Sequence, residues 1–403
     1  MVTFVARQPI LDKKLGIYGY ELLFRAQSTS VAFDAIEGNF ASSEIITNAF
    51  HELGIAEVTG GKRAFVNFTE TLLLSGIATI LPSSVLVVEL LENILPTPEV
   101  LEACKKLRKR GFKIALDDFI LTPEYSALLS VADIIKIDFM STPMDKIELF
   151  ARSLADSRTT LLAEKIETQE MYEEAVRMGF SLFQGYFFAK PVIVDPSRQR
   201  LNPMKINCLR LIRAANDEDF DFRRIANIIK NDVALSYRLL RVLNSAFFGL
   251  HYTVKNINQA LAILGMVEVK KWVTLVSLNE MSSNKPVELM RMALLRAKFL
   301  ETLAPHMGIP RSADDLFMLG LVSLMDTMMD TAMLDLIEQT NLAENIARPL
   351  LTGEGRFAEL LRMVIHYERS EWDQMLSMAE TLHIEPKTLS DIYLEVARWA
   401  DSM

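Results

Sequence analysis

The first 190 residues alternate between short apolar runs and longer amphipathic segments. The short runs are rich in β-branched and aromatic residues, as strands are, and the segments between them carry apolar residues every three or four positions, as helices do. Strands separated by helices pair in parallel, because a parallel pair needs a long crossover connection. The pattern predicts a parallel α/β barrel or a doubly wound sheet with the strands YGYELLF, RAFVNF, SVLVVEL, FKIALDD, DIIKID, TLLAEK and SLFQGYFF.

The pattern changes at residues 191–203, where PVIVDPSRQRLNP carries three prolines and several polar residues. Proline interrupts the hydrogen bonding of both helices and sheets. Beyond this stretch the chain is almost wholly helical in pattern, as in residues 221–248, where apolar positions recur at three- and four-residue steps. We therefore expect two domains, an α/β domain over residues 1–195 and an all-α domain over residues 196–403.

Polar side chains close the expected strands at intervals of about 20 to 28 residues, the length of one strand plus one helix. In a parallel barrel the carboxyl ends of the strands meet at one mouth, so these side chains would converge. Each residue alone could equally be a helix cap, a turn former or a salt-bridged lysine, but the repetition predicts a site. The residues are Asn67, Glu89, Asp117, Asp118, Lys136, Glu164 and Gln184.

The chemistry of this set follows from its ligand atoms. Carboxylate and carboxamide oxygens without histidine or cysteine suit Mg²⁺ or Mn²⁺ rather than zinc. Two cations would also explain the adjacent Asp117 and Asp118, because metal charge offsets their repulsion. Two such ions are the usual device for the attack of water on a phosphodiester, and Lys136 could hold that water or neutralise phosphoryl oxygens.

Charge and composition narrow the possible partners and location. The chain has 403 residues and a formal net charge of -9, so no overall field attracts duplex DNA. Its two cysteines, Cys104 and Cys208, are too few for a disulfide framework or a thiolate zinc site. We find neither a basic leader nor an apolar run of about 18 residues, so we expect a cytoplasmic protein without a membrane span.

Several motifs resemble the EAL domain family. ELLFR, with Glu21 and Arg25, is similar to the signature Glu-Ala-Leu-x-Arg, and RQPI, with Gln8, is similar to the family's opening strand. VNFTE, VELLE, ALDDF, IKID, AEKIE and QGYFFAKP follow in the family's order and spacing. The resemblance implies a modified TIM-type (β/α)8 barrel and a phosphodiesterase that opens cyclic di-GMP to linear pGpG with two Mg²⁺ or Mn²⁺ ions.

The resemblance also implies roles for individual residues. One metal ion would be held by Glu21, Asn67, Glu89 and Asp117, and the second by Asp117, Asp118 and Glu164. The catalytic side chains would be Lys136, Glu164 and Gln184. Substrate would contact Gln8, Arg25 and Pro191, while Glu92 would anchor the loop after Asp118 and Glu167 would support the site from outside.

Two departures from the family bear on turnover. The family continues its aspartate pair as Asp-Asp-Phe-Gly-x-Gly, a loop that couples metal binding to dimerisation, whereas here FILTPEY follows Asp118. Ile120 lacks the conformational freedom of glycine and Pro123 stiffens the segment. Lys165 replaces a second family glycine and places a cation beside Glu164. An alternative to an active enzyme is therefore a noncatalytic cyclic di-GMP receptor or interaction scaffold, and a homodimer is one expected assembly.

The helical half resembles the HDOD domain, a relative of HD-type phosphohydrolases that lacks their catalytic residues. The resemblance rests on residues 225–249, which include Asp232, Asn244 and Ser245, and on INQALAILG, residues 257–265. Where an HD enzyme has Gly-Leu-Leu-His-Asp, this chain has GLVSL, residues 320–324. The resemblance implies regulation through an unidentified signalling protein rather than catalysis. Direct nucleic-acid binding has little support, because no basic stripe interleaved with aromatic residues is evident.

Overall fold

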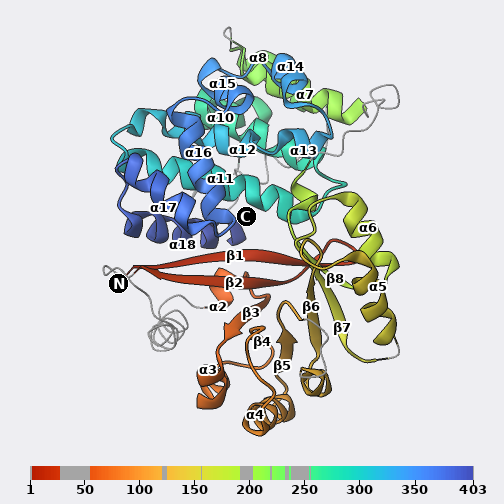
Figure 1. Cartoon of the computed structure of the whole chain (residues 1–403). Helices are drawn as coiled ribbons and strands as arrows, with labels where there is room; N and C mark the ends of the chain where they lie inside the picture. Colours follow the sequence, from red (N-terminus) through yellow and green to blue (C-terminus); the bar gives the residue numbers. More distant parts are fainter. Residues whose placement is uncertain are drawn as a thin grey trace. The chain divides into compact units, whose positions relative to one another are not determined.

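The chain divides by its contacts into two compact units, Met1–Lys190 with Met363–Met403, and Pro191–Arg362. The computed structural model describes residues 2–27, 55–119, 125–155, 157–190, 203–217, 220–231, 236, 254 and 256–402 (Figure 1). The domain division at residue 195 stays a prediction, and the contacts add one feature that the sequence pattern did not indicate. The C-terminal residues from Met363 onward group with the barrel because they pack on its first strand.

The first unit is built on a closed barrel whose strands follow chain order. Strands β2 to β8 pair in parallel, whereas β1 runs antiparallel to both of its neighbours, β2 and β8. An antiparallel first pair needs only a short turn, and Asp12 fixes it by accepting hydrogen bonds from the amides of Lys14 (2.8 Å) and Gly16 (2.9 Å). The strands are β1 Val2–Asp12, β2 Ile17–Gln27, β3 Arg63–Phe68, β4 Leu86–Leu90, β5 Lys113–Leu116, β6 Ile134–Asp138, β7 Thr160–Glu164 and β8 Leu182–Gln184.

Helices connect the parallel strands, as the amphipathic segments predicted. Three of them begin at a threonine whose hydroxyl accepts an amide hydrogen bond of the first turn: Thr69, Thr97 and Thr168. The described connecting elements are α2 Ile55–Val58, α3 Glu70–Ser75, η1 Ile77–Ile80, α4 Pro98–Lys109, η2 Ser126–Ser130, α5 Met144–Ser153, α6 Gln169–Arg177 and η3 Phe187–Ala189. The sequence prediction of an α/β barrel followed by an all-α region is confirmed.

Three C-terminal helices follow, α16 Arg356–Glu368, α17 Trp372–Thr381 and α18 Pro386–Ser402. The boundary between the two units falls inside α16. Aromatic side chains of this segment pack on β1: the ring of Trp372 stacks on Phe4 at 5.6 Å, and the ring of Tyr367 lies edge to face with Phe4 at 6.2 Å. The Tyr393 hydroxyl also accepts a hydrogen bond from the Arg7 amide at 3.2 Å. This segment thus buries one side of the first strand (Figure 1).

The second unit is helical throughout its described residues. Its core lies between α7, α8 and α10 and includes Leu211, Ile225, Ile229, Leu261 and Val273. Helices α11 and α12 approach closely because residue 320 is glycine; a Cβ there would collide with the backbone of Ala297. The elements are α7 Pro203–Ala215, α8 Phe222–Lys230, α10 Ile257–Met281, α11 Val287–His306, η5 Pro310–Ser312, α12 Ala313–Val322, α13 Met325–Met329, α14 Met333–Thr340 and α15 Glu344–Thr352.

The residues that the sequence analysis named in the helical half lie partly outside and partly inside the described residues. Asp232, Asn244 and Ser245 lie outside the described residues, so their placement stays untested. Ser323 and Leu324, which stand where an HD enzyme has its His-Asp pair, form the junction between α12 and α13. Among the described helices, none alone has the length and apolar character to cross a membrane; one sharply bent pair, Pro310–Met329 with Met333–Thr340, meets those criteria by length and composition only.

Candidate active site

The site sits directly above an apolar layer inside the barrel. Side chains on a strand alternate between its two faces, so residues two apart point the same way. Except for Asp118, each polar residue expected at a strand end, from Asn67 to Gln184, lies two positions after a buried apolar residue of one core cluster. That cluster is Ile10, Phe65, Val87, Ala115, Ile134, Leu162 and Leu182. The same alternation that fills the barrel therefore directs the polar side chains into its mouth.

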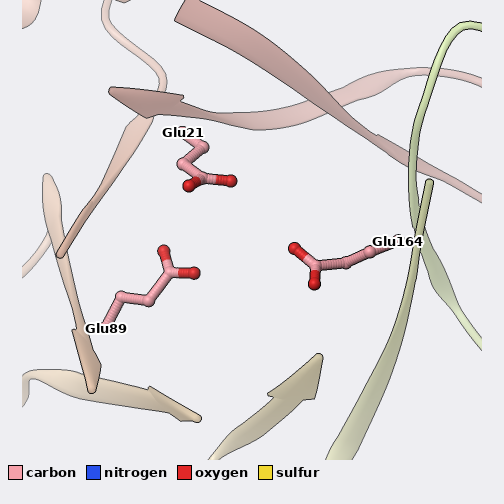
Figure 2. A group of neighbouring side chains, drawn as sticks. All are labelled: Glu21, Glu89 and Glu164. Carbon is pink, nitrogen blue, oxygen red and sulfur yellow. The ribbon is translucent and has the colours of Figure 1, made fainter. Parts of the chain in front are cut away.

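Three glutamates from different strands point toward one another, as Figure 2 shows for Glu21, Glu89 and Glu164. One carboxylate oxygen of each lies within 4.8 Å of the other two. All three side chains are buried, with Glu89 at 0% exposure. Such proximity of buried carboxylates is unfavourable unless positive charge lies between them.

Lys136 supplies positive charge at this point. Its ammonium group pairs with Asp117 at 2.8 Å, Glu164 at 2.6 Å and Glu21 at 3.2 Å, and it also contacts Glu89. Burial lowers the pKa of Lys136, but the surrounding carboxylates outweigh burial and hold that pKa well above its usual value. Lys136 is therefore charged, and one cation faces several carboxylates.

A second acidic group overlaps the first. Oxygens of Asp117, Asp118 and Glu164 also lie within 4.8 Å of one another. Asp118 adopts a left-handed backbone conformation with φ 39, a conformation that aspartate tolerates better than most residues. Glu164 belongs to both groups, so the two groups adjoin at the end of β7.

Carboxamides and one further turn complete the wall of the site. The Gln184 amide donates to Glu21 at 2.7 Å and to Gln8 at 2.9 Å, and Asn67 donates to Glu21 at 3.4 Å. Gly185 follows Gln184 with φ +139, and a Cβ there would collide with the backbone of Ile166. Only glycine permits the chain to leave β8 at this angle.

Electrostatics indicate that the site has a deficit of positive charge. Burial raises the pKa of Glu89 well above its usual value, against the lowering effect of Lys136. Burial likewise raises the pKa of Glu164 to about 8, again against Lys136. Burial and the neighbouring Asp117 raise the pKa of Asp118. Burial therefore favours the protonated form of these acids, and at Glu89 and Glu164 the charge of Lys136 does not offset it.

The residues present fit divalent cations. Four buried oxygen acceptors of the site have no hydrogen-bond partner: Asn67 Oδ1, Glu89 Oε2, Asp118 Oδ1 and Gln184 Oε1. Buried acceptors without partners are costly, and hard oxygen ligands in groups of this kind suit Mg²⁺, Mn²⁺ or Ca²⁺. Within the described residues, the acid groups that could hold a metal are these two alone.

The raised pKa of Glu164 predicts how the stability of the protein in EDTA depends on pH. Between about pH 4.5, where an unfolded glutamate loses its proton, and about pH 8, the folded protein keeps the proton that the unfolded chain releases. Stability should therefore fall as pH rises through this window, by at most about 1.4 kcal/mol per pH unit for each such group. Hydrogen exchange of the β7 amides, measured over a denaturant series at several pH values, gives the change of stability with pH.

Glu164→Gln should flatten this slope, because the glutamine does not titrate. Glu102→Gln, at an exposed position on α4, is the matched control and should leave the slope unchanged. Equal slopes in wild type and Glu164→Gln would contradict the assignment of the proton to this carboxyl group.

Other residues implied by the resemblance lie outside the two acid groups. Arg25 pairs with Asp373 at 2.7 Å, and Glu167 pairs with Lys190 at 2.8 Å on the surface. Glu92 is exposed. Pro191 lies outside the described residues, as do positions 120–124 of the altered loop, including Ile120 and Pro123. The roles of these residues stay predictions.

Sequence reasoning missed Asp138. Its carboxylate accepts hydrogen bonds from the Lys165 ammonium at 2.5 Å and from the amides of Met140 (2.6 Å) and Ser141 (3.0 Å). Although burial raises the pKa of Asp138, these hydrogen bonds outweigh it and lower that pKa. Lys165 also lies 4.0 Å from Asp118. The signal in the sequence was the two-residue spacing from Lys136, which puts both side chains on one face of β6.

Comparisons with known proteins agree with the fold. The EAL domain model matches residues 61–191, and the HDOD domain model matches residues 201–371. Together the barrel, its acid-lined mouth and the helical unit define an EAL domain joined to an HDOD domain. The chain belongs to the family of proteins with this pair of domains.

Two relatives are similar along the whole chain. The cyclic di-GMP phosphodiesterase CdgJ of Vibrio cholerae is 33% identical over all of this chain and 93% of its own length. The uncharacterized protein YuxH of Bacillus subtilis is also 33% identical, over all of this chain and 99% of its own length.

Solved structures resemble part of the chain, among them a protein with an EAL domain. The YkuI protein of Bacillus subtilis, in complex with substrate c-di-GMP and calcium, is 17% identical with a TM-score of 0.40 and coverage of 57% of this chain and 72% of its own. Klebsiella pneumoniae BlrP1, in a calcium/cy-diGMP complex, is 22% identical with a TM-score of 0.39 and coverage of 47% and 56%.

Proposed function

We propose that this protein hydrolyses cyclic di-GMP to linear pGpG with two divalent cations, Mg²⁺ or Mn²⁺, in the cytoplasm. The observation that carries the proposal is the pair of acid groups that share Glu164 at the mouth of the barrel. The EAL domain match and the whole-length similarity to a cyclic di-GMP phosphodiesterase support the choice of substrate.

The two acid groups support a ligand set for each of the proposed cations. In the proposal one ion is held by Glu21, Asn67, Glu89 and Asp117 and the other by Asp117, Asp118 and Glu164. The group of Glu21, Glu89 and Glu164 and the group of Asp117, Asp118 and Glu164 support these two sets. Two divalent cations in these positions would activate water for in-line attack on the phosphodiester and stabilise the leaving oxygen. The four unpartnered oxygens of the site could then coordinate these cations.

The chain's own side chains provide the remaining functions. The buried ammonium group of Lys136 is held at the centre of the site, where it can donate a hydrogen bond to water or to a phosphoryl oxygen. Gln184 is oriented by Glu21 and Gln8, so its carboxamide can position the same water. Arg25 offers a planar guanidinium to a phosphate of the substrate.

The helical unit would act as a regulatory domain that binds an unidentified signalling protein. Ser323 and Leu324 occupy the positions of the His-Asp pair, and neither side chain is a metal ligand of the kind that HD enzymes use. Assembly into a homodimer is part of the same proposal.

A turnover assay tests the enzymatic proposal. Purified full-length protein is incubated with cyclic di-GMP and Mg²⁺ or Mn²⁺, and the nucleotides are separated by chromatography. We expect pGpG from wild type and none above background from Glu21→Ala. Equal amounts of pGpG from both proteins, or none from either, would count against the proposal.

A second function, a noncatalytic receptor for cyclic di-GMP, is favoured by Lys165. This cation lies beside Asp118 and is tethered by Asp138, in the position of a family glycine. A cation there would compete with the second metal ion. Calorimetry with cyclic di-GMP in Ca²⁺ and in EDTA separates the functions, because binding without turnover in Mg²⁺ or Mn²⁺ indicates a receptor, and neither binding nor turnover indicates a scaffold.

Lys165→Met is expected to tighten binding of the second metal ion about threefold to tenfold, since it removes a positive charge that lies 4.0 Å from Asp118. Methionine keeps an unbranched side chain that is one atom shorter, and it does not relieve the left-handed backbone at this residue, φ 54. Titration calorimetry with Mn²⁺ measures the affinity and the number of sites without any requirement for activity.

Lys146→Met, an exposed change on α5, is the matched control and should bind Mn²⁺ as wild type does. Unchanged Mn²⁺ affinity in Lys165→Met would show that the tethered ammonium does not oppose the second ion.

A further inference from the structure

Residues 368–373, here named the C-terminal turn, touch the barrel at three points around the site. The Asp373 carboxylate pairs with Arg25 of β2 at 2.7 Å. The Arg369 carbonyl accepts a hydrogen bond from the Gln8 amide of β1 at 3.5 Å, and the Glu368 carbonyl accepts one from the Tyr186 hydroxyl at 3.0 Å. These three barrel residues come from three separate segments, so the turn is seated on the rim rather than attached at one point.

Each of these barrel residues borders the acid groups. Gln8 is the direct cross-strand partner of Glu21 and receives a hydrogen bond from Gln184. Arg25 follows Glu21 by four positions on the same face of β2. Tyr186 lies two residues after Gln184, and the guanidinium of Arg369 lies over its ring at 5.3 Å. The turn therefore occupies the edge of the proposed substrate site.

The turn has a defined shape. His366 and Glu371 are joined side chain to side chain at 2.5 Å, and the Glu371 amide donates to the His366 carbonyl at 2.9 Å. Ser370 between them takes a left-handed backbone conformation, φ 59. A turn closed by its own hydrogen bonds presents Asp373 at a fixed place, although 82% of that side chain is exposed to solvent.

The ion pair of Asp373 with Arg25 occupies a guanidinium that could otherwise bind a phosphate. A carboxylate on a guanidinium uses the same planar donors that a phosphate would use, so one excludes the other. We infer that Asp373 holds Arg25 in the substrate-free protein and that a phosphate of cyclic di-GMP must displace it, which makes the C-terminal turn an internal competitor of substrate. The inference rests on the proposed function and adds a regulatory element to the same site.

The turn is also placed to receive a signal. It begins at the last residue of α16, the helix that contains the boundary between the two units along the chain. Asp373 lies beyond both matched family regions, which end at residues 191 and 371. A partner that bound the helical unit and shifted the end of α16 would alter the contact between Asp373 and Arg25, and with it the apparent affinity for substrate.

Asp373→Asn in the full-length protein tests the inference. Because the ion pair is exposed, we expect a modest gain, a dissociation constant for cyclic di-GMP in Ca²⁺ about two- to fivefold lower, and a KM lowered similarly with kcat unchanged. The gain should shrink at high salt, where exposed charges are screened. Asp391→Asn, the same change at an exposed site on α18, should match wild type.

Hydrogen exchange of peptide 366–376 reports on the turn itself, without nucleotide. Asp373→Asn should exchange faster than wild type and Asp391→Asn should not, and cyclic di-GMP should speed exchange of this peptide in wild type. An unchanged dissociation constant in Asp373→Asn, or slower exchange when nucleotide binds, would overturn the inference.

The two proposals fail in different ways. If wild-type protein neither binds nor hydrolyses cyclic di-GMP, the proposed function and the competition with substrate are both ruled out. Faster exchange in Asp373→Asn would then show only that the ion pair of Asp373 with Arg25 stabilises the C-terminal turn. A wild-type protein that hydrolyses the nucleotide, with Asp373→Asn indistinguishable in affinity, removes the competition and keeps the enzyme.

Discussion

Asp117→Asn is expected to abolish hydrolysis of cyclic di-GMP, with kcat/KM lowered by about 1,000-fold or more. Asp117 contacts Lys136 at 2.8 Å and belongs to the acid group of Asp118 and Glu164, and the proposal makes it a ligand of both cations. Asparagine keeps the shape but removes the negative charge, which weakens the binding of both cations at once. Rates of pGpG formation and Mn²⁺ titration calorimetry measure the two effects.

The fold should survive this change, because Lys136 keeps Glu21, Glu89 and Glu164 as partners. Asp145→Asn, at an exposed position of α5, is the matched control and should retain wild-type turnover and Mn²⁺ binding. Hydrolysis by Asp117→Asn within about tenfold of wild type would rule out a shared role for this carboxylate.

Lys136→Met is expected to destabilise the protein in EDTA by about 3–5 kcal/mol, the usual cost of removing one partner from a buried ion pair. Lys136 is 1% exposed and contacts several buried carboxylates, which would face one another without a cation between them. Because the chain has two units, a single unfolding midpoint is not defined for it. Hydrogen exchange of amides in β4 and β6 gives the stability of the barrel alone.

Divalent cations should rescue Lys136→Met, since they supply positive charge to the same carboxylates. Saturating Mn²⁺ is expected to restore most of the lost protection in β4 and β6, whereas hydrolysis stays impaired because the buried ammonium group is gone. Lys62→Met, at an exposed position, should behave as wild type in both measurements. A Lys136→Met protein as stable as wild type in EDTA would show that the carboxylates are already neutral.

Much of the barrel followed from local patterns in the sequence. Alternation along RAFVNF put Phe65 and Asn67 on one face, and the same two-residue step put Val87 below Glu89. Because strand direction and side-chain direction are fixed by the backbone, a polar residue two positions after a core residue must emerge at the same mouth. The first strand, Val2–Asp12, was indicated only by the RQPI motif. Its antiparallel pairing with both neighbours was not predicted, because an alternation of strands and helices indicates parallel pairing.

Which of these residues meet depends on the folded chain. An α/β barrel with acids at its strand ends and a helical second half could be predicted without it, since these features depend on the periodicity of neighbouring residues. Only closure of the barrel placed Lys136 among carboxylates from four other segments and brought Lys165 to Asp138. Only the return of the C-terminal helices to β1 brought Asp373 to Arg25, because contacts between residues hundreds of positions apart depend on packing and leave no local signal in the sequence.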